Sequence, residues 1–190
     1  GLDRLDESQI AAAGAIAGTG GLVAVTGPAG AGKTTMLRVA HAALTRQRRR
    51  MLIVAPTRKA ASVASREVGA AATSLHALLA DHGYRWATDA AGAQVWSRLS
   101  RGDADPTTGV VYDGPAKFVL RRGDRIVVDE AGMVDLQTAA ALVDLALEHG
   151  VGVAMVGDPH QALPVGHAGA MASAVRYATA SVELDTVHRF

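Results

Sequence analysis

The chain has 190 residues, of which 49% are hydrophobic and 19% are charged, so its composition is that of one globular domain and not of a disordered segment. Its formal net charge of +1 gives no overall attraction for a polyanion, so any contact with a polyanion would have to come from a local basic patch. The absence of cysteine excludes disulfides and thiolate metal sites.

The N-terminal region contains a long uncharged stretch at residues 10–32, which superficially resembles a membrane span. The stretch is rich in alanine and glycine and contains a proline, so a helix over residues 8–17 and a buried strand explain it better. Asp6 or Ser8 is a suitable N-cap for that helix. No basic-then-apolar secretion signal opens the chain. We therefore expect a soluble, cytoplasmic protein without a membrane span.

Apolar runs of strand length alternate with segments of helical periodicity along the chain. Strands are predicted at residues 22–26, 51–55, 126–129, 151–156 and 182–184, and further helices at 34–46, 58–68, 136–148 and 169–177. Strands that alternate with helices predict a parallel sheet with right-handed crossovers. The expected fold class is therefore α/β, with helices on both faces of the sheet.

Two segments need a separate explanation. Residues 81–113 contain both tryptophans and two of the three tyrosines without clear periodicity, so we expect a surface insertion in a single domain that spans residues 1–190. The basic run at residues 46–50 ends a predicted helix, where cations complement the helix dipole. A binding role for this run is the alternative.

A phosphate-binding motif follows the first predicted strand. Residues 27–34 read GPAGAGKT, which fits the pattern G-x-x-x-x-G-K-[ST] between a strand and a helix. The loop that surrounds a triphosphate would consist of Gly27, Pro28, Ala29, Gly30, Ala31 and Gly32, and all of these except the proline can donate a backbone N–H. The N-terminus of the following helix adds the positive end of its dipole. Lys33 would reach the β- and γ-phosphates, and the Thr34 hydroxyl would bind Mg²⁺. A Gly-rich turn with an incidental lysine is the alternative.

An acidic pair ends the third predicted strand. Residues 126–131 read IVVDEA, the form of a Walker B strand, and the apolar run fixes the position of Asp129. Asp129 can hold Mg²⁺ through its water shell, and Glu130 can activate the water that attacks the γ-phosphate. Capping of the next helix is the alternative, but the phosphate loop upstream favours the catalytic interpretation.

Two further candidates for catalysis follow the fourth and fifth predicted strands. Ligands of an open parallel sheet lie beyond the carboxyl ends of its strands, which is where these residues fall. Gln161 could contact both the γ-phosphate and the attacking water. Arg189 could neutralise charge that develops on the γ-phosphate, and an ordinary surface arginine is the alternative.

Candidate nucleic-acid contacts follow the second predicted strand. Thr57, Arg58 and Lys59, and then Thr73 and His76, provide hydroxyls and cations that could bind phosphodiesters at helix N-termini. Helix capping is the competing explanation for Thr57 and Thr73, and each could do both. The seven histidines show no ligand spacing, so His76 is expected to pack or to contact nucleic acid and not to bind a metal.

The order of these signals resembles the first motor domain of superfamily 1 helicases. The resemblance is strongest to the RecD-like branch, with TraA/MobA-type conjugative relaxases and exonuclease V alpha-like proteins. Residues 5–9 resemble the family's adenine-reading element, and residues 27–35 resemble its motif I. Its motif Ia and a further DNA-contacting element resemble residues 55–61 and 73–78. Motifs II, III and IV resemble residues 128–134, 157–161 and 184–189. Two departures are Ala162, where leucine is common, and Phe190, where many relatives have glutamine.

The resemblance implies a RecA-like P-loop NTPase fold with ATP and Mg²⁺ as cofactors and single-stranded DNA as a partner. It gives Gln9 the edge of the adenine base, places Thr35 in the nucleotide-binding motif, and implies 5′→3′ movement along DNA. P-loop phosphotransferases and non-catalytic nucleotide switches of the AAA type are the competing function classes. The Gly157–Gln161 segment opposes the first, and the base candidate Glu130 opposes the second.

The resemblance also implies a second RecA-like domain in the same protein. The chain opens with Gly1 and ends at Phe190, so we expect a fragment of a longer helicase. In such motors the second domain supplies a further arginine to the ATP site, and removal of an arginine finger lowers the rate by a factor on the order of 10³–10⁵. We expect this chain to bind Mg-nucleotide, to hydrolyse it very slowly and not to unwind duplex DNA.

Overall fold

The computed structural model describes residues 5–28, 32–158 and 169–185. The chain forms two compact units, one made of Gly1–Ser74 with Leu120–Phe190 and the other of Leu75–Val119. Across the described ranges, every helix is too short or too polar to cross a membrane.

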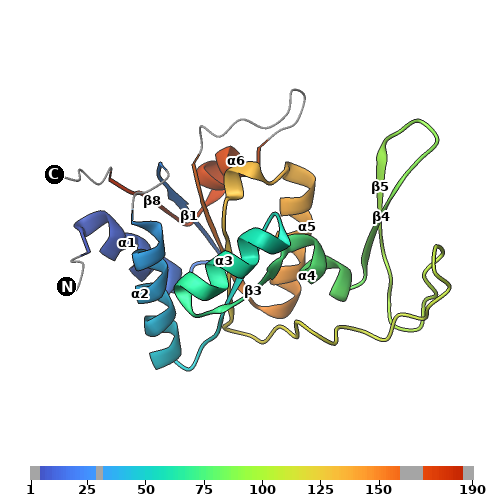
Figure 1. The fold of residues 1–190 in the computed structure, drawn as a ribbon, viewed down its shortest axis with the longest axis horizontal. Helices are drawn as coiled ribbons and strands as arrows, with labels where there is room; N and C mark the ends of the chain where they lie inside the picture. The colour runs from blue at the N-terminus through green and yellow to red at the C-terminus, as the bar shows by residue number, and fades with distance from the viewer. Residues whose placement is uncertain (1–4, 29–31, 159–168, 186–190) are drawn as a thin grey trace. The chain divides into compact units, whose positions relative to one another are not determined.

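The larger unit is built on a parallel sheet of six strands (Figure 1). Its strands are β1 (Leu22–Thr26), β2 (Met51–Ala55), β3 (Ala71–Ser74), β6 (Arg125–Val128), β7 (Gly152–Gly157) and β8 (Ala180–Glu183). They are arranged in the order β3-β2-β6-β7-β1-β8, and each neighbouring pair is parallel. The carboxyl ends of all six strands therefore meet at one edge, which is the arrangement predicted for a P-loop NTPase.

Helices cover both faces of this sheet (Figure 1). On one face lie α1 (Glu7–Ile16), α2 (Lys33–Arg46) and α3 (Arg58–Val68), and on the other lie α5 (Leu136–His149) and α6 (Ala170–Tyr177). Val25 and Ile53 are buried in one core with Leu37 of α2, and the side chains that alternate with them face α5 and α6. The predicted α/β class with helices on both faces is therefore confirmed.

The smaller unit contains α4 (Leu75–Asp81) and an antiparallel hairpin of β4 (Tyr84–Thr88) and β5 (Gln94–Arg98). Trp86 pairs with Trp96 across the hairpin, with ring centroids 5.2 Å apart. His76 of α4 stacks on Trp86 at 4.6 Å. The hairpin falls inside residues 81–113, where we predicted no regular element, because aromatic pairing and not apolar alternation stabilises it.

Candidate active site

Lys33 and Asp129 meet at the carboxyl edge of the sheet. Lys33 opens α2 after the loop that follows β1, and Asp129 directly follows β6. The Nζ atom of Lys33 donates to Oδ1 of Asp129 at 2.7 Å, although the residues lie 96 positions apart in sequence. The side chain of Asp129 is 11% exposed and that of Lys33 is 38% exposed. A largely buried carboxylate is thus paired with a cation that solvent still reaches.

Gly32 shapes the start of α2. It is the N-cap residue of this helix and has a φ of +78°, in the left-handed region that favours glycine. A Cβ atom at this position would overlap the side-chain amide nitrogen of Gln9, which donates to the Gly32 carbonyl at 3.2 Å. As a glycine, the N-cap residue makes no side-chain bond to the N–H groups of the first turn of α2, and such N–H groups suit an anionic ligand.

Gln9 is held by a capping box at the start of α1. Its backbone N–H donates to the Asp6 carboxylate at 2.8 Å, and its side-chain oxygen accepts from the Asp6 N–H at 2.9 Å. The Ser8 hydroxyl, and after it the Gln9 N–H, hold the pKa of the Asp6 carboxyl below its ordinary value. Gln9 is buried, so α1 delivers a fixed amide to the phosphate loop.

Glu130 adopts an unusual backbone conformation. Its φ is +52° although it is not glycine, and its N–H donates to Oδ1 of Asp129 at 3.0 Å. A 3₁₀ turn, η1 (Ala131–Met133), follows directly. Left-handed residues other than glycine cost free energy and gather at functional sites, so this outlier supports a functional hypothesis for Glu130.

Gly157 lies between the two halves of the site, which are the phosphate loop and the turn that contains the acidic pair. Its carbonyl accepts from the Gly27 N–H at 3.2 Å, which ties the end of β7 to the end of β1. A Cβ atom on Gly157 would lie 2.8 Å from the backbone nitrogen of Gly132 and 3.0 Å from that of Ala131, in the turn after Glu130. Only glycine allows this close approach.

A pocket of about 440 Å³ opens beside these residues. Lys33, Thr34, Asp129 and Glu130 line it together with residues of α3. Among the residues that the structure describes, none form a cluster of three or more His, Cys, Asp or Glu side chains suited to a metal. One carboxylate and one hydroxyl, completed by phosphate oxygens and water, are hard ligands of the kind that Mg²⁺ accepts. The residues present therefore fit a magnesium–triphosphate.

Other predicted nucleotide contacts lie near this pocket or outside the described residues. Pro28 is exposed, and Thr35 is half-buried in the first turn of α2. Outside the described ranges lie Ala29, Gly30, Ala31, Gln161 and Arg189.

The predicted nucleic-acid residues belong to several different elements. Thr57 is the N-cap of α3, where its hydroxyl accepts from the Ala60 N–H at 3.1 Å, and Arg58 and Lys59 are exposed in the following turn. Thr57 and Lys59 line the pocket that Lys33 lines. Thr73 is buried in β3 and is not part of that lining, and His76 belongs to the smaller unit.

The model of a family described as an AAA domain matches residues 4–190. The chain belongs to this AAA domain family. The AAA domain is 33% identical over 187 residues to the conjugal transfer protein TraA of Agrobacterium fabrum. The match covers 98% of the AAA domain but only 14% of that relative, so the chain spans a small part of the curated relatives it matches.

Solved structures with the same fold come from Pif1. The AAA domain superimposes on Pif1 from Bacteroides sp in complex with ADP-AlF4 with a TM-score of 0.58 and 22% identity, over 98% of this chain and 43% of that one. A Pif1 helicase complex with ADP-AlF3 and single-stranded DNA gives a TM-score of 0.55 and 21% identity, over 97% and 43% of the two chains. The TraA match confirms the predicted resemblance to TraA-type proteins, and the Pif1 structures show that this chain shares the fold of a helicase domain.

Glu67 is a candidate that the motifs of the AAA domain did not identify. It lies in the last turn of α3 and lines the pocket, and its Oε2 atom accepts from the Thr34 hydroxyl at 3.3 Å. The Nε atom of Arg38 donates to its backbone carbonyl at 2.6 Å. Only the packing of α3 on α2 brings Glu67 to the phosphate loop, so no sequence spacing could have indicated it.

Proposed function

We propose that this AAA domain binds Mg²⁺-ATP and acts as the motor domain of an ATP-dependent DNA helicase or translocase. The contact between Lys33 and Asp129 carries the proposal, because it joins the end of the phosphate loop to the acidic strand end at one pocket. Both groups are of the type that P-loop NTPases use for a metal-bound triphosphate.

Four residues of the pocket have proposed roles in catalysis. The ammonium of Lys33 binds the β- and γ-phosphates, while the N–H groups at the start of α2 bind phosphate oxygens. Thr34 and Asp129 would hold Mg²⁺, which when bound neutralises phosphate charge. The Glu130 carboxylate takes the proton of the attacking water. The resemblance assigns Gln9 to the adenine, Gln161 to the γ-phosphate and Arg189 to charge neutralisation.

The cellular role is proposed from the relatives. TraA is named as a conjugal transfer protein, and one Pif1 structure contains single-stranded DNA. We infer that this chain works within a longer cytoplasmic protein that has a second RecA-like domain. Thr57, Arg58 and Lys59 would contact single-stranded DNA, and Thr73 and His76 are further candidates from the same resemblance. Movement along DNA would be 5′→3′.

Titration of the 190-residue chain with a fluorescent ATP analogue and Mg²⁺ tests the nucleotide site. Lys33→Ala should abolish measurable binding, while Lys117→Ala, which removes an exposed lysine from the smaller unit, should leave binding unchanged. Absence of binding by the wild-type chain would contradict the proposal. Hydrolysis by a longer protein that carries this domain, with and without single-stranded DNA, then separates a DNA motor from a phosphotransferase or a switch.

A further inference from the structure

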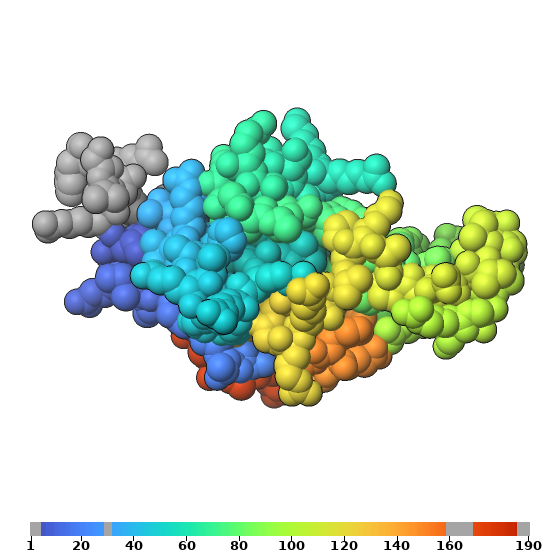
Figure 2. Space-filling view, turned by 90° about the horizontal axis from the view of Figure 1, so that it is seen from below, coloured from blue at the N-terminus to red at the C-terminus, as the bar shows by residue number. Residues whose placement is uncertain are grey.

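A second group of cations lies at the opposite edge of the same sheet. The turn after α2, residues 47–50, and the turn before β6, residues 121–124, are neighbours because Met51 of β2 is in register with Arg125 of β6. Figure 2 shows the cyan chain after α2 directly beside the gold chain before β6. The exposed arginines of this region are Arg46, Arg48, Arg50, Arg121 and Arg122.

The fold explains some of the arginines here. Arg49 donates to the carbonyls of Ala17, Gly18 and Gly123 at 2.7–2.8 Å. The Nε atom of Arg50 donates to Oδ1 of Asp124 at 3.0 Å. Arg125 is fully buried, and burial, followed by the charge of Arg49, lowers the pKa of its guanidinium to about 10. Arg49 and Arg125 thus hold the strand starts together, and Arg50 is paired with Asp124.

Four arginines remain, and we call Arg46, Arg48, Arg121 and Arg122 the arginine patch. Within the described part of the chain, their side chains make no hydrogen bond and no ion pair. The neighbouring acid, Asp124, is buried and is already bonded to Arg50 and to the Arg121 N–H. Helix dipoles account for Arg46 in the last turn of α2 and for Arg122, which lies over Gly150 at the end of α5. The dipole of α2 also favours a cation at Arg48, just after its C-cap Gln47, but no helix end accounts for Arg121.

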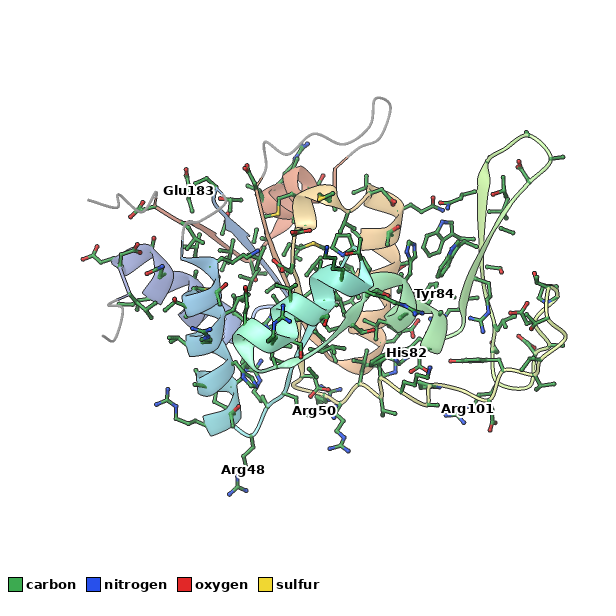
Figure 3. The ribbon with its side chains drawn as sticks, in the orientation of Figure 1. Arg48, Arg50, His82, Tyr84, Arg101 and Glu183 are labelled. Atoms are coloured by element: carbon green, nitrogen blue, oxygen red, sulfur yellow. The ribbon has the colours of Figure 1, made fainter. Side chains whose placement is uncertain are left out.

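The backbone of Arg48 provides an independent observation. Its φ is +57°, and its N–H donates to the Thr45 carbonyl at 3.0 Å, while the Arg49 N–H donates to that of Leu44 at 2.9 Å. These bonds form a Schellman motif, in which the left-handed position favours glycine. An arginine at this position opposes stability, and Figure 3 shows its side chain pointing away from the ribbon. The Schellman turn itself therefore does not explain why an arginine stands where glycine is favoured.

We propose that the arginine patch binds the phosphate backbone of duplex DNA. The planar guanidinium forms paired hydrogen bonds with phosphate oxygens, and a duplex offers closely spaced phosphates to several arginines at once. The turns at residues 47–50 and 121–124 carry no aromatic side chain on which unpaired bases could stack, which disfavours a single strand. Contacts to phosphates carry no sequence information, so the binding is independent of DNA sequence. The patch goes beyond the proposed function, because its binding to DNA requires no nucleotide.

Fluorescence anisotropy with a labelled DNA duplex of about 20 base pairs, measured at several salt concentrations, tests the patch. Arg48→Gly should weaken binding about threefold to tenfold and lower the slope of log affinity against log salt by about one. The same change should raise Tm by about 2–4 °C, because glycine relieves the left-handed strain. Arg48→Ala should lose the same affinity without the gain in Tm. This pair of variants separates the effect of the lost charge on affinity from the effect of the backbone conformation on stability.

Arg66→Gln, which removes an exposed arginine from α3, is the matched control and should leave duplex affinity unchanged. Unchanged affinity in the triple variant Arg48→Gly, Arg121→Gln, Arg122→Gln would overturn the proposal. Tighter binding of a polyglutamate peptide than of the duplex would overturn it in favour of an acidic protein partner. Lys33→Ala should keep duplex binding at this edge, so failure of the nucleotide site and failure of the patch are distinguishable.

Discussion

Lys33 and Asp129 form a hydrogen-bonded ion pair of 2.7 Å between the phosphate loop and the acidic strand end. The lysine proposed to bind phosphate is thus neutralised by the carboxylate proposed to bind Mg²⁺. A magnesium–nucleotide satisfies both groups together, whereas a nucleotide without the ion would take the lysine and leave the largely buried carboxylate without its cation. Affinity for nucleotide should therefore depend strongly on Mg²⁺.

Asp129→Asn tests this dependence. The amide oxygen can still accept from the Glu130 N–H, so the turn should be retained, but the charge that attracts the ion is lost. We expect Mg²⁺ to strengthen nucleotide binding at least about tenfold in the wild type and hardly at all in the variant. Titrations with Mg²⁺ and with EDTA measure the two affinities. An undiminished effect of Mg²⁺ in the variant would exclude Asp129 as its ligand.

Glu130→Gln should separate binding from hydrolysis. The amide keeps the size and polarity of the side chain but cannot accept the proton of water, so phosphate release should fall by a factor on the order of 10²–10⁴ at unchanged affinity. Glu183→Gln, which changes an exposed glutamate on β8, is the control. Normal turnover by the Glu130 variant would mean that another group is the base.

Gly32→Ala and Gly69→Ala form a matched pair for the loop geometry. Both glycines have positive φ, +78° and +82°, but a Cβ at Gly69 meets nothing within 4 Å, while one at Gly32 overlaps Gln9. Gly69→Ala should cost about 1 kcal/mol from backbone strain alone. Gly32→Ala should cost about 1–3 kcal/mol more and also lose nucleotide affinity. Urea unfolding and nucleotide titration measure both quantities, and equal results for the two variants would disprove the role of the contact.

The Asp6 cap predicts a pH dependence. Its pKa is lower in the folded chain than its ordinary value of 3.8, because the Ser8 hydroxyl and the Gln9 N–H favour the charged form. The stabilisation is therefore fully present above pH 3.8 and is lost as the pH falls through the lower folded pKa. Asp6→Ala should cost about 1 kcal/mol at pH 7, and this cost should shrink below pH 3.8. Thermal unfolding of the wild type and the variant at pH 7 and below pH 3.8 shows whether the difference in stability between them disappears in acid.

The bounds of helices and strands were predicted most accurately where the apolar pattern extends over a whole element. The strands at Leu22–Thr26 and Met51–Ala55 and the helix at Arg58–Val68 have the predicted bounds. The third predicted strand ends one residue early, at Val128, because the chain turns into the left-handed Glu130. No prediction covered β3, because its four residues, Ala71–Ser74, form too short a run and depend on pairing with β2.

The site could be predicted as far as its motifs extend. Lys33 and Asp129 were expected together because both follow strands of one parallel sheet, and the structure brings them into contact. Glu67 could not be anticipated, because only helix packing brings it to Thr34. The left-handed Arg48 was equally hidden, since the sequence favours no positive φ at an arginine.

Gly157 has a mechanical consequence for a motor. Its carbonyl accepts a hydrogen bond from the phosphate loop, and a Cβ on it would meet the turn that follows the acidic pair, so the tip of β7 lies against both parts of the site. A pull on the chain that emerges from this tip would be transmitted to both halves at once. The position that links the phosphate loop to the acidic turn is thus occupied by a residue that has no side chain.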